Sequence, residues 1–215
     1  MQQLFLQFPA KSEYKSEDFF ISQANKEAFT YVTKWPNWNN GIYSSILLLY
    51  GEDGSGKTHL AHIWQRLTNA KLLSIKDNFE SAKESLILEN IENIEQEPLL
   101  HLINSANENK HYLLLTSNLS PVKLNFSLPD LNSRILAIPS ISITSPDQEL
   151  MKVVLLKNLS DRQLKIHPAA IDYIISRIDR SFSKLFKFID ELERESKTQK
   201  RSITIPLAKQ VMENC

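Results

Sequence analysis

The chain has 215 residues, and its 25 lysines and arginines balance 25 aspartates and glutamates, so the formal net charge is zero. Such a balance gives no sign of a broad nucleic-acid or membrane-binding surface. The only cysteine is Cys215, the last residue, which excludes an internal disulfide and favours a reducing compartment. No apolar run approaches the roughly 18 residues of a membrane span, and no basic region followed by an apolar one begins the chain. We therefore expect a cytoplasmic protein without membrane contact.

The first residues alternate with period two. Leu4, Leu6 and Phe8 occupy every second position after Gln3. In an extended segment these three side chains enter an apolar pocket together, while Gln3 supplies hydrogen bonds. An edge strand or an N-terminal staple shows the same alternation, so the residues alone leave both interpretations open.

A phosphate-binding motif follows the first predicted strand. Residues 46–50 form an apolar run typical of a buried parallel strand, and residues 57–69 have helical spacing. Between them the chain fits the pattern G-x-x-x-x-G-K-[ST]. The matching residues are Gly51, Glu52, Asp53, Gly54, Ser55, Gly56, Lys57 and Thr58.

The residue types of this motif suit a nucleotide. Glycines let backbone N–H groups turn toward phosphates, and the helix N-terminus adds its positive dipole end. Lys57 is expected to reach the β- and γ-phosphates of ADP or ATP, and the Thr58 hydroxyl to ligate Mg²⁺. His59 follows on the same helix and is placed with the nucleotide-binding residues, although an ordinary histidine at the edge of the core fits its position too.

Further strands and helices alternate after the motif, which predicts a parallel α/β sheet. Expected strands are 71–75, 85–88, 112–116 and 136–139, and a helix is expected over 96–109. After Pro146 the pattern becomes purely helical, with helices expected over 147–160, 168–178, 181–198 and 204–213. We place a domain boundary at about residues 143–146.

Two polar residues follow predicted strands at the edge where the phosphate site lies. Glu89 comes after the strand 85–88 and is expected to hold Mg²⁺ directly or through water. Asn118 comes just after the strand 112–116 and is expected to orient a water or touch the γ-phosphate. A surface charge at Glu89 and a turn-forming role for Asn118 are the alternatives.

The order of these motifs resembles AAA+ ATPases of the DnaA/Hda family. The resemblance extends over essentially the whole chain, from an adenine-side entry segment at Tyr14 to Phe19 and Asn25 to the helical end. Where a replication initiator of this family continues into a DNA-binding domain, this chain ends, which favours the smaller Hda branch. The resemblance implies a clamp-binding segment over 1–12, an AAA+ nucleotide-binding α/β domain over 13–145 and a helical lid domain over 146–215.

The most specific part of the resemblance is Pro129-Asp130-Leu131-Asn132-Ser133-Arg134. It implies that Arg134 is an arginine finger that meets the γ-phosphate of a neighbouring molecule, a contribution worth about 10³ to 10⁵ in rate in other systems. An ion pair with Asp130, or a capping role, is the alternative.

For the N-terminal segment, the resemblance implies docking on the DNA polymerase sliding clamp through Gln3, Leu4, Leu6 and Phe8. The implied function is then regulation of replication: bound to the clamp, the protein promotes hydrolysis of DnaA-bound ATP and so inactivates the initiator. Self-association through the AAA+ interface and weak or indirect DNA contact are further expectations. A DNA-remodelling or helicase-loading ATPase and a nucleotide-independent scaffold for DnaA and the clamp are the alternatives.

Three departures from the family pattern bear on the nucleotide. Asn90 stands where hydrolytic members have a second acid, which predicts weak intrinsic ATPase activity. Glu89 replaces the more usual aspartate. Ser183 stands where the lid arginine of the family would stand. Lys184 and Arg180 are the candidate substitutes, although an ammonium is not equivalent to a guanidinium fork.

Overall fold

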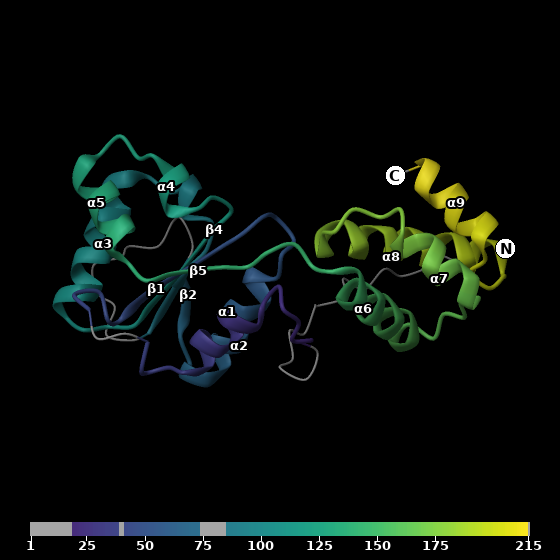
Figure 1. Ribbon diagram of the computed structural model, residues 1–215, viewed down its shortest axis with the longest axis horizontal. Coiled ribbons are helices and arrows are strands. Elements are labelled where there is room, and N and C mark those ends of the chain that lie inside the picture. Colours follow the sequence, from purple (N-terminus) through teal and green to yellow (C-terminus); the bar gives the residue numbers. More distant parts are fainter. Residues whose placement is uncertain (1–18, 39–40, 74–84, 215) are drawn as a thin grey trace, which may run out of the picture.

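A computed structural model describes residues 19–38, 41–73 and 85–214. The segment from Gln3 to Phe8, with its expected clamp contact, therefore lies outside the described residues. Figure 1 shows two parts side by side, a sheet flanked by helices and a group of helices that contains the C-terminal end.

The sheet has five parallel strands in the order β2-β3-β4-β1-β5. They are β1 (Ile46–Tyr50), β2 (Lys71–Leu73), β3 (Leu86–Leu88), β4 (Leu113–Ser117) and β5 (Ser140–Ser142). The three central strands are rich in leucine and isoleucine, as parallel strands covered on both faces require. At the centre of the sheet, Leu48 of β1 pairs with Leu115 of β4 and with Ser140 of β5.

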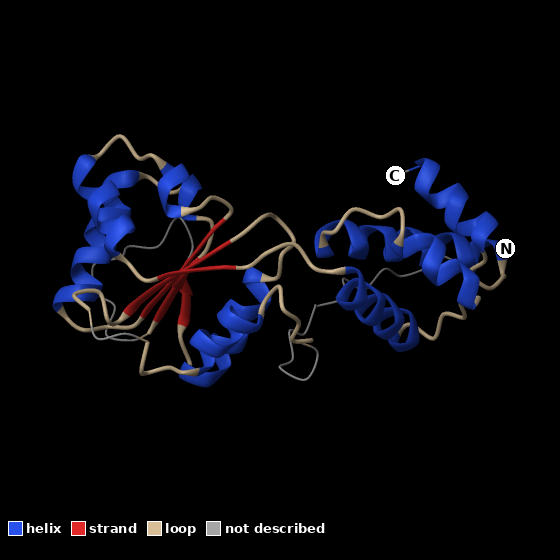
Figure 2. Cartoon of the chain, viewed as in Figure 1, coloured by secondary structure: helices blue, strands red, loops and turns tan. Residues whose placement is uncertain are grey.

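Helices cover both faces of this sheet, as Figures 1 and 2 show. One face packs against α1 (Lys26–Thr33) and α2 (Lys57–Thr68), with Trp64 fully buried. The other packs against α3 (Gln96–Glu108) and α5 (Pro129–Ala137), with the 3-10 helix η3 (Ile91–Asn93) and the short α4 (Pro121–Leu124) beside them. Successive strand side chains alternate between these two cores because a strand has a period of two.

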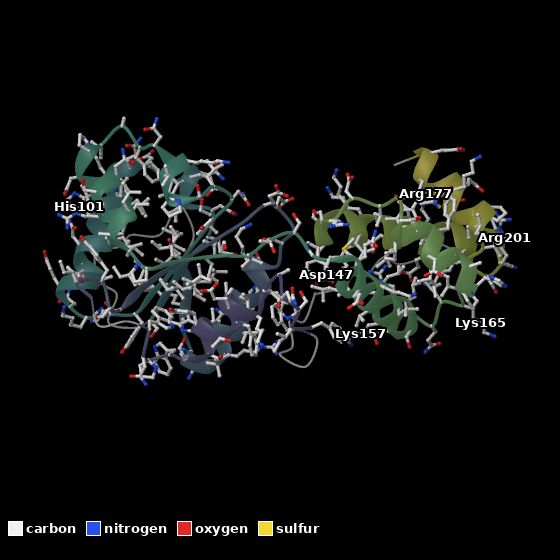
Figure 3. The ribbon with its side chains drawn as sticks, viewed as in Figure 1. His101, Asp147, Lys157, Lys165, Arg177 and Arg201 are labelled. Carbon is white, nitrogen blue, oxygen red and sulfur yellow. The ribbon has the colours of Figure 1, made fainter. Side chains whose placement is uncertain are left out.

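The described residues from 148 to 214 form helices and one isolated bridge between Ile166 and Ile203. The helices are α6 (Gln148–Asp161), α7 (Pro168–Ile175), α8 (Phe182–Gln199) and α9 (Ile205–Asn214). Asp147, labelled in Figure 3, begins this part: its side chain accepts a hydrogen bond from the Leu150 N–H at 2.7 Å and caps α6. A third hydrophobic core, including Leu185 and Ile189 of α8, holds the helices together.

The expected α/β sheet and helical end are confirmed, but the last strand was placed wrongly. Residues 136 and 137 are the end of α5, and β5 begins only at Ser140. Pro129 opens α5 at its first turn, where proline suits a helix, and residues 135–137 of the apolar run continue the helix, with Leu136 exposed. The predicted helix 168–178 also ends earlier, at Ile175. Within the described part of the chain, no helix is long and apolar enough to cross a membrane.

Candidate nucleotide-binding site

The G-x-x-x-x-G-K-[ST] segment forms the turn between β1 and α2, where the sequence placed it. Gly54 and Gly56 have positive φ angles of 70° and 107°, which other residues adopt only under strain. Gly51 is required for a different reason, since a Cβ atom there would lie 2.2 Å from the Ile143 carbonyl oxygen. The glycines thus permit both the loop conformation and its close contact with the chain after β5.

Lys57 lies at the start of α2 and is only 6% exposed. Its ammonium donates to the carbonyl oxygens of Gly51 at 2.8 Å and Glu52 at 2.9 Å, and to Asn118 Oδ1 at 2.8 Å. Burial lowers the pKa of Lys57 from its ordinary value, and the negative charges of Asp53, Glu92 and Glu89 counteract this effect. The loop therefore holds a largely desolvated cation at the edge of the sheet.

Glu89 and Asn118 follow β3 and β4, so both lie at the carboxyl edge of the sheet, as expected. Glu89 Oε1 is buried and has no hydrogen-bond partner among the described residues. An oxygen of this kind suits a hard cation such as Mg²⁺. No cluster of three or more His, Cys, Asp or Glu side chains in the described ranges is arranged to hold a metal.

Asn90, the residue in place of a second acid, has a left-handed conformation with φ of 54°. Its N–H donates to the Thr116 hydroxyl at 3.1 Å, which joins the ends of β3 and β4. In this position Asn90 has a structural contact, and its amide cannot act as a general base.

Glu92, a residue that the sequence pattern did not indicate, lies in contact with Asn118. Glu92 Oε1 accepts hydrogen bonds from the Asn118 backbone N–H at 3.1 Å and from Asn118 Nδ2 at 2.7 Å. Glu92 lies in η3, three residues after Glu89. Glu89 lies before this helix and Asn90 between them is left-handed, so no helical spacing relates the two glutamates and no local pattern indicated Glu92.

Arg134 lies on α5 and is held by its own chain. Its Nε and Nη2 atoms donate to Asp130 Oδ2 at 3.1 and 3.0 Å, and Nη1 donates to the Tyr43 hydroxyl at 3.2 Å. These hydrogen bonds raise the pKa of Arg134 above its ordinary value. The ion pair with Asp130 was one of the two interpretations from sequence, and Tyr43 is a second contact that the sequence did not indicate.

The first turn of α8 lies directly on the phosphate-binding loop. Phe182 N–H donates to the Gly54 carbonyl at 2.8 Å, and the Ser181 hydroxyl donates to the Asp53 carbonyl at 3.3 Å. A Cβ atom on Gly54 would lie 2.3 Å from Ser181 Oγ and 2.7 Å from the Ser183 nitrogen. Ser183 therefore lies against the loop, in the region where the sequence pattern led us to expect a lid arginine.

No described contact holds Lys184 or Arg180, the two candidate substitutes for that arginine, against the phosphate-binding loop. Lys184 pairs with Asp179 in the loop before α8, and its side chain is largely exposed. Arg180 is exposed in the same loop. The basic end of the lid, near Arg201 in Figure 3, contains ion pairs of its own, such as Lys197 with Glu193 at 2.5 Å.

His59 and the entry segment meet on the α1 and α2 side of the sheet. The ring of Phe19 packs edge-on against His59, with centroids 5.1 Å apart, and stacks on Phe29 at 5.5 Å. Asn25 stabilises this segment, because its Nδ2 donates to the Phe20 carbonyl and its Oδ1 accepts from the Ser22 N–H, both at 2.9 Å. The structure thus brings Phe19 of the predicted entry segment beside the start of α2, whereas Tyr14 lies outside the described residues.

Comparisons with known proteins agree with this arrangement. Residues 147–212 match the family described as Hda, lid domain. The chain is 25% identical to the chromosomal replication initiator protein DnaA of Flavobacterium psychrophilum over 244 aligned positions, covering 99% of this chain and 51% of that protein. It therefore spans about half the length of this curated relative.

Solved structures show the same fold. Domain III of the Thermotoga maritima replication initiation protein DnaA superposes with a TM-score of 0.80 at 18% identity, covering 96% of this chain and 98% of that one. AMPPCP-bound DnaA from Aquifex aeolicus gives a TM-score of 0.67 at 20% identity, covering 88% of this chain and 69% of that one.

A five-stranded parallel sheet with a phosphate-binding loop and a helical lid at the C-terminal end defines an AAA+ P-loop protein. The lid match and the relationship to DnaA narrow this class further. Residues 147–212 match the Hda lid, and nearly the whole chain is similar to the replication initiator DnaA, so the chain is similar to AAA+ proteins of the DnaA/Hda family.

Proposed function

We propose that this protein is a nucleotide-binding regulator of replication initiation that inactivates DnaA. Held on the DNA polymerase sliding clamp by Gln3, Leu4, Leu6 and Phe8, it presents Arg134 to ATP-bound DnaA and promotes hydrolysis of that ATP. The observation that carries the proposal is Arg134, a guanidinium on α5 of a chain that has its own phosphate-binding loop between β1 and α2.

Nucleotide binding by the chain itself is supported by the geometry of the loop. Lys57 lies at the edge of the sheet and donates hydrogen bonds to neutral oxygens. A phosphate anion can take the place of these acceptors, because its charge-assisted hydrogen bond with the ammonium is stronger. The related DnaA structure with AMPPCP binds a nucleotide in the same fold. When bound, Mg²⁺ would neutralise phosphate charge, and Thr58 and Glu89 are the residues that would hold it.

Slow hydrolysis of the protein's own nucleotide is part of the proposal. Asn90 has no carboxylate with which to polarise an attacking water, and its backbone is engaged with Thr116. The bound ADP or ATP would then organise the protein for its partner, and the chemical step would take place in DnaA.

In the partner's site, Arg134 would supply positive charge to the phosphoryl group during transfer. A guanidinium meets spreading negative charge at two points, which an ammonium cannot do. Asp130 and Tyr43 hold Arg134 in a defined direction beforehand, which reduces the conformational entropy lost when the two proteins meet.

The experiment that tests this function is a reconstitution with DnaA-bound radiolabelled ATP, sliding clamp loaded on DNA, and this protein. We expect rapid conversion of ATP to ADP on DnaA only when clamp and protein are both present. Conversion without the clamp would contradict the clamp-bound mechanism. Fast, DNA-stimulated turnover by this protein alone would instead support a DNA-remodelling or helicase-loading ATPase, and no conversion under any condition would reject regulation of DnaA.

A further inference from the structure

Glu92 forms the end of a chain of contacts that leads to the phosphate-binding loop. Its Oε1 accepts two hydrogen bonds from Asn118, and Asn118 Oδ1 in turn accepts from Lys57 Nζ. The other oxygen of Glu92, Oε2, is buried with no partner among the described residues. A partly buried carboxylate with one unsatisfied oxygen is costly, so the contact with Asn118 is expected to have a function that offsets this cost.

The two neighbours of the Asn118 amide leave it a single orientation. An ammonium can only donate hydrogen bonds, and an ionised carboxylate can only accept them. The amide oxygen must therefore face Lys57 and the amide nitrogen must face Glu92, as the distances of 2.8 and 2.7 Å show. Rotating the amide by half a turn would place its NH₂ group against the Lys57 ammonium and its oxygen against the Glu92 carboxylate.

We propose that Glu92 is a positioning residue of the nucleotide site, which fixes Asn118 with its oxygen toward Lys57. The proposal rests on the nucleotide binding proposed above. It gives Asn118 a defined role as an acceptor, so that Asn118 directs the Lys57 ammonium or the proton of a water, while its NH₂ group stays with Glu92. The negative charge of Glu92 additionally favours the protonated form of Lys57.

A purely structural role makes a different prediction. Glu92 also accepts the backbone N–H of Asn118, and that bond alone would hold the loop after β4 without any effect through the side-chain amide. If Glu92 only supports the loop, losing it should add to the effect of losing the Asn118 side chain. If Glu92 acts through that side chain, the two losses should not add.

The test is a double-mutant cycle with AMPPCP and ADP, each with Mg²⁺, measured by isothermal titration calorimetry. We expect Glu92→Ala and Asn118→Ala each to weaken AMPPCP binding about three- to tenfold, and the double variant to lose no more than the weaker-binding single variant. Glu95→Ala, an exposed glutamate just before α3, is the matched control and should bind as the parent does. Additive losses, or parental affinity in Glu92→Ala, would overturn the proposal.

A second measurement does not need a bound nucleotide. In ¹⁵N-labelled protein, the side-chain amide protons of Asn118 should shift in Glu92→Ala and, less, in Glu92→Gln, which keeps an acceptor oxygen but loses the charge. They should not shift in Glu95→Ala. If the parent binds neither nucleotide while these signals still follow Glu92, the positioning role stands and the proposed nucleotide binding fails. Unchanged signals in both Glu92 variants would reject the positioning role, and Glu92→Gln serves as the test if the alanine variant does not fold.

Discussion

At the scale of single residues, Lys57 is a nearly buried cation whose three acceptors are neutral oxygens. Two are backbone carbonyls of the same loop and the third is the Asn118 amide. Hydrogen bonds from an ammonium to an anion are stronger than those to neutral oxygens. A phosphate group thus has an energetic advantage over the acceptors that Lys57 contacts within its own chain.

Replacing Lys57 with alanine is expected to abolish retention of ADP and ATP while the chain stays folded. The change removes the only side-chain cation that the motif directs to the β- and γ-phosphates. Binding of labelled nucleotide and the circular dichroism spectrum would be measured in parallel, with Lys71→Ala, an exposed lysine of β2, as the control. Parental affinity in Lys57→Ala would show that the nucleotide site is elsewhere.

Nucleotide affinity should also fall at alkaline pH, because Lys57 binds phosphate only when protonated. Burial places the pKa of Lys57 in the free protein below its ordinary value of 10.5, so affinity should be full at neutral pH and decline as pH rises through that lowered pKa. Titrations from about pH 7.5 to about pH 10 bracket this range. The guanidinium of Lys57→Arg does not titrate in this range, so any nucleotide affinity that this variant keeps should not change with pH. An equal decline of affinity in both proteins would show that another group causes the pH dependence.

Arg134 acts, in the proposed mechanism, entirely in another molecule. Arg134→Ala should keep ADP and clamp binding but reduce stimulation of ATP hydrolysis by DnaA about 10²-fold or more. Arg134→Lys should restore little, since an ammonium lacks the planar two-point contact. The reconstituted hydrolysis assay measures this, with Arg66→Ala on the exposed side of α2 as the control. Normal stimulation by Arg134→Ala, or loss of its own nucleotide, would exclude the finger role.

At the scale of elements, the contact between α8 and the phosphate-binding loop depends on one glycine. Gly54 combines a positive φ angle with a backbone hydrogen bond to Phe182 and close approach of Ser181 and Ser183. A side chain at this position would disturb both the loop and the first turn of the lid helix.

Gly54→Ala should therefore lower the free energy of unfolding by about 1–3 kcal/mol from backbone strain alone, and should weaken nucleotide binding as well. Adding Ser181→Gly should not restore stability, because the Ser183 backbone nitrogen remains 2.7 Å from the new Cβ atom. Urea denaturation measures the change. Asp53→Ala, an exposed neighbour, should stay within about 0.5 kcal/mol of the parent, and an equally stable Gly54→Ala would contradict both the positive φ angle at Gly54 and the close approach of the lid.

Most elements were predictable because their signals are local. The apolar runs of β1 and β4 and the glycine pattern between β1 and α2 each specify their own structure. The last strand was misplaced because residues 135–138 are apolar in a way that fits either a strand or a helix, and Pro129 decided the matter in favour of a helix. Contacts such as Glu92 with Asn118, or Tyr43 with Arg134, join residues far apart in the chain, so no local pattern could indicate them.

At the scale of the whole molecule, three hydrophobic cores divide the described chain. Two lie on opposite faces of the sheet, and the third lies among α6, α7, α8 and α9. The lid thus has an apolar interior of its own, and hydrogen bonds of its first α8 turn connect it with the phosphate-binding loop.

The proposed clamp contact belongs to this scale, because it joins the chain to a second protein. Leu6→Ala and Phe8→Ala should each weaken clamp binding by about 1–3 kcal/mol, since apolar anchors dominate the affinity of a short docked strand. Surface plasmon resonance on immobilised clamp measures this, and nucleotide binding should not change. Gln7→Ala, at an intervening position of the same segment, is the control. Full clamp binding by the double variant would show that the segment has another role.

The hydrogen bond between Phe182 and Gly54 fixes the first turn of α8 on the phosphate-binding loop, so a rotation of the helix about this turn moves its far end most. Its 18 residues correspond to a length of about 27 Å at 1.5 Å per residue. A tilt of roughly 10° about the first turn would displace the far end, next to α9, by about 5 Å. A small shift of the phosphate-binding loop, too small to alter its fold, would thus move the opposite end of the lid by several ångströms. A second protein bound to the lid could distinguish the two positions.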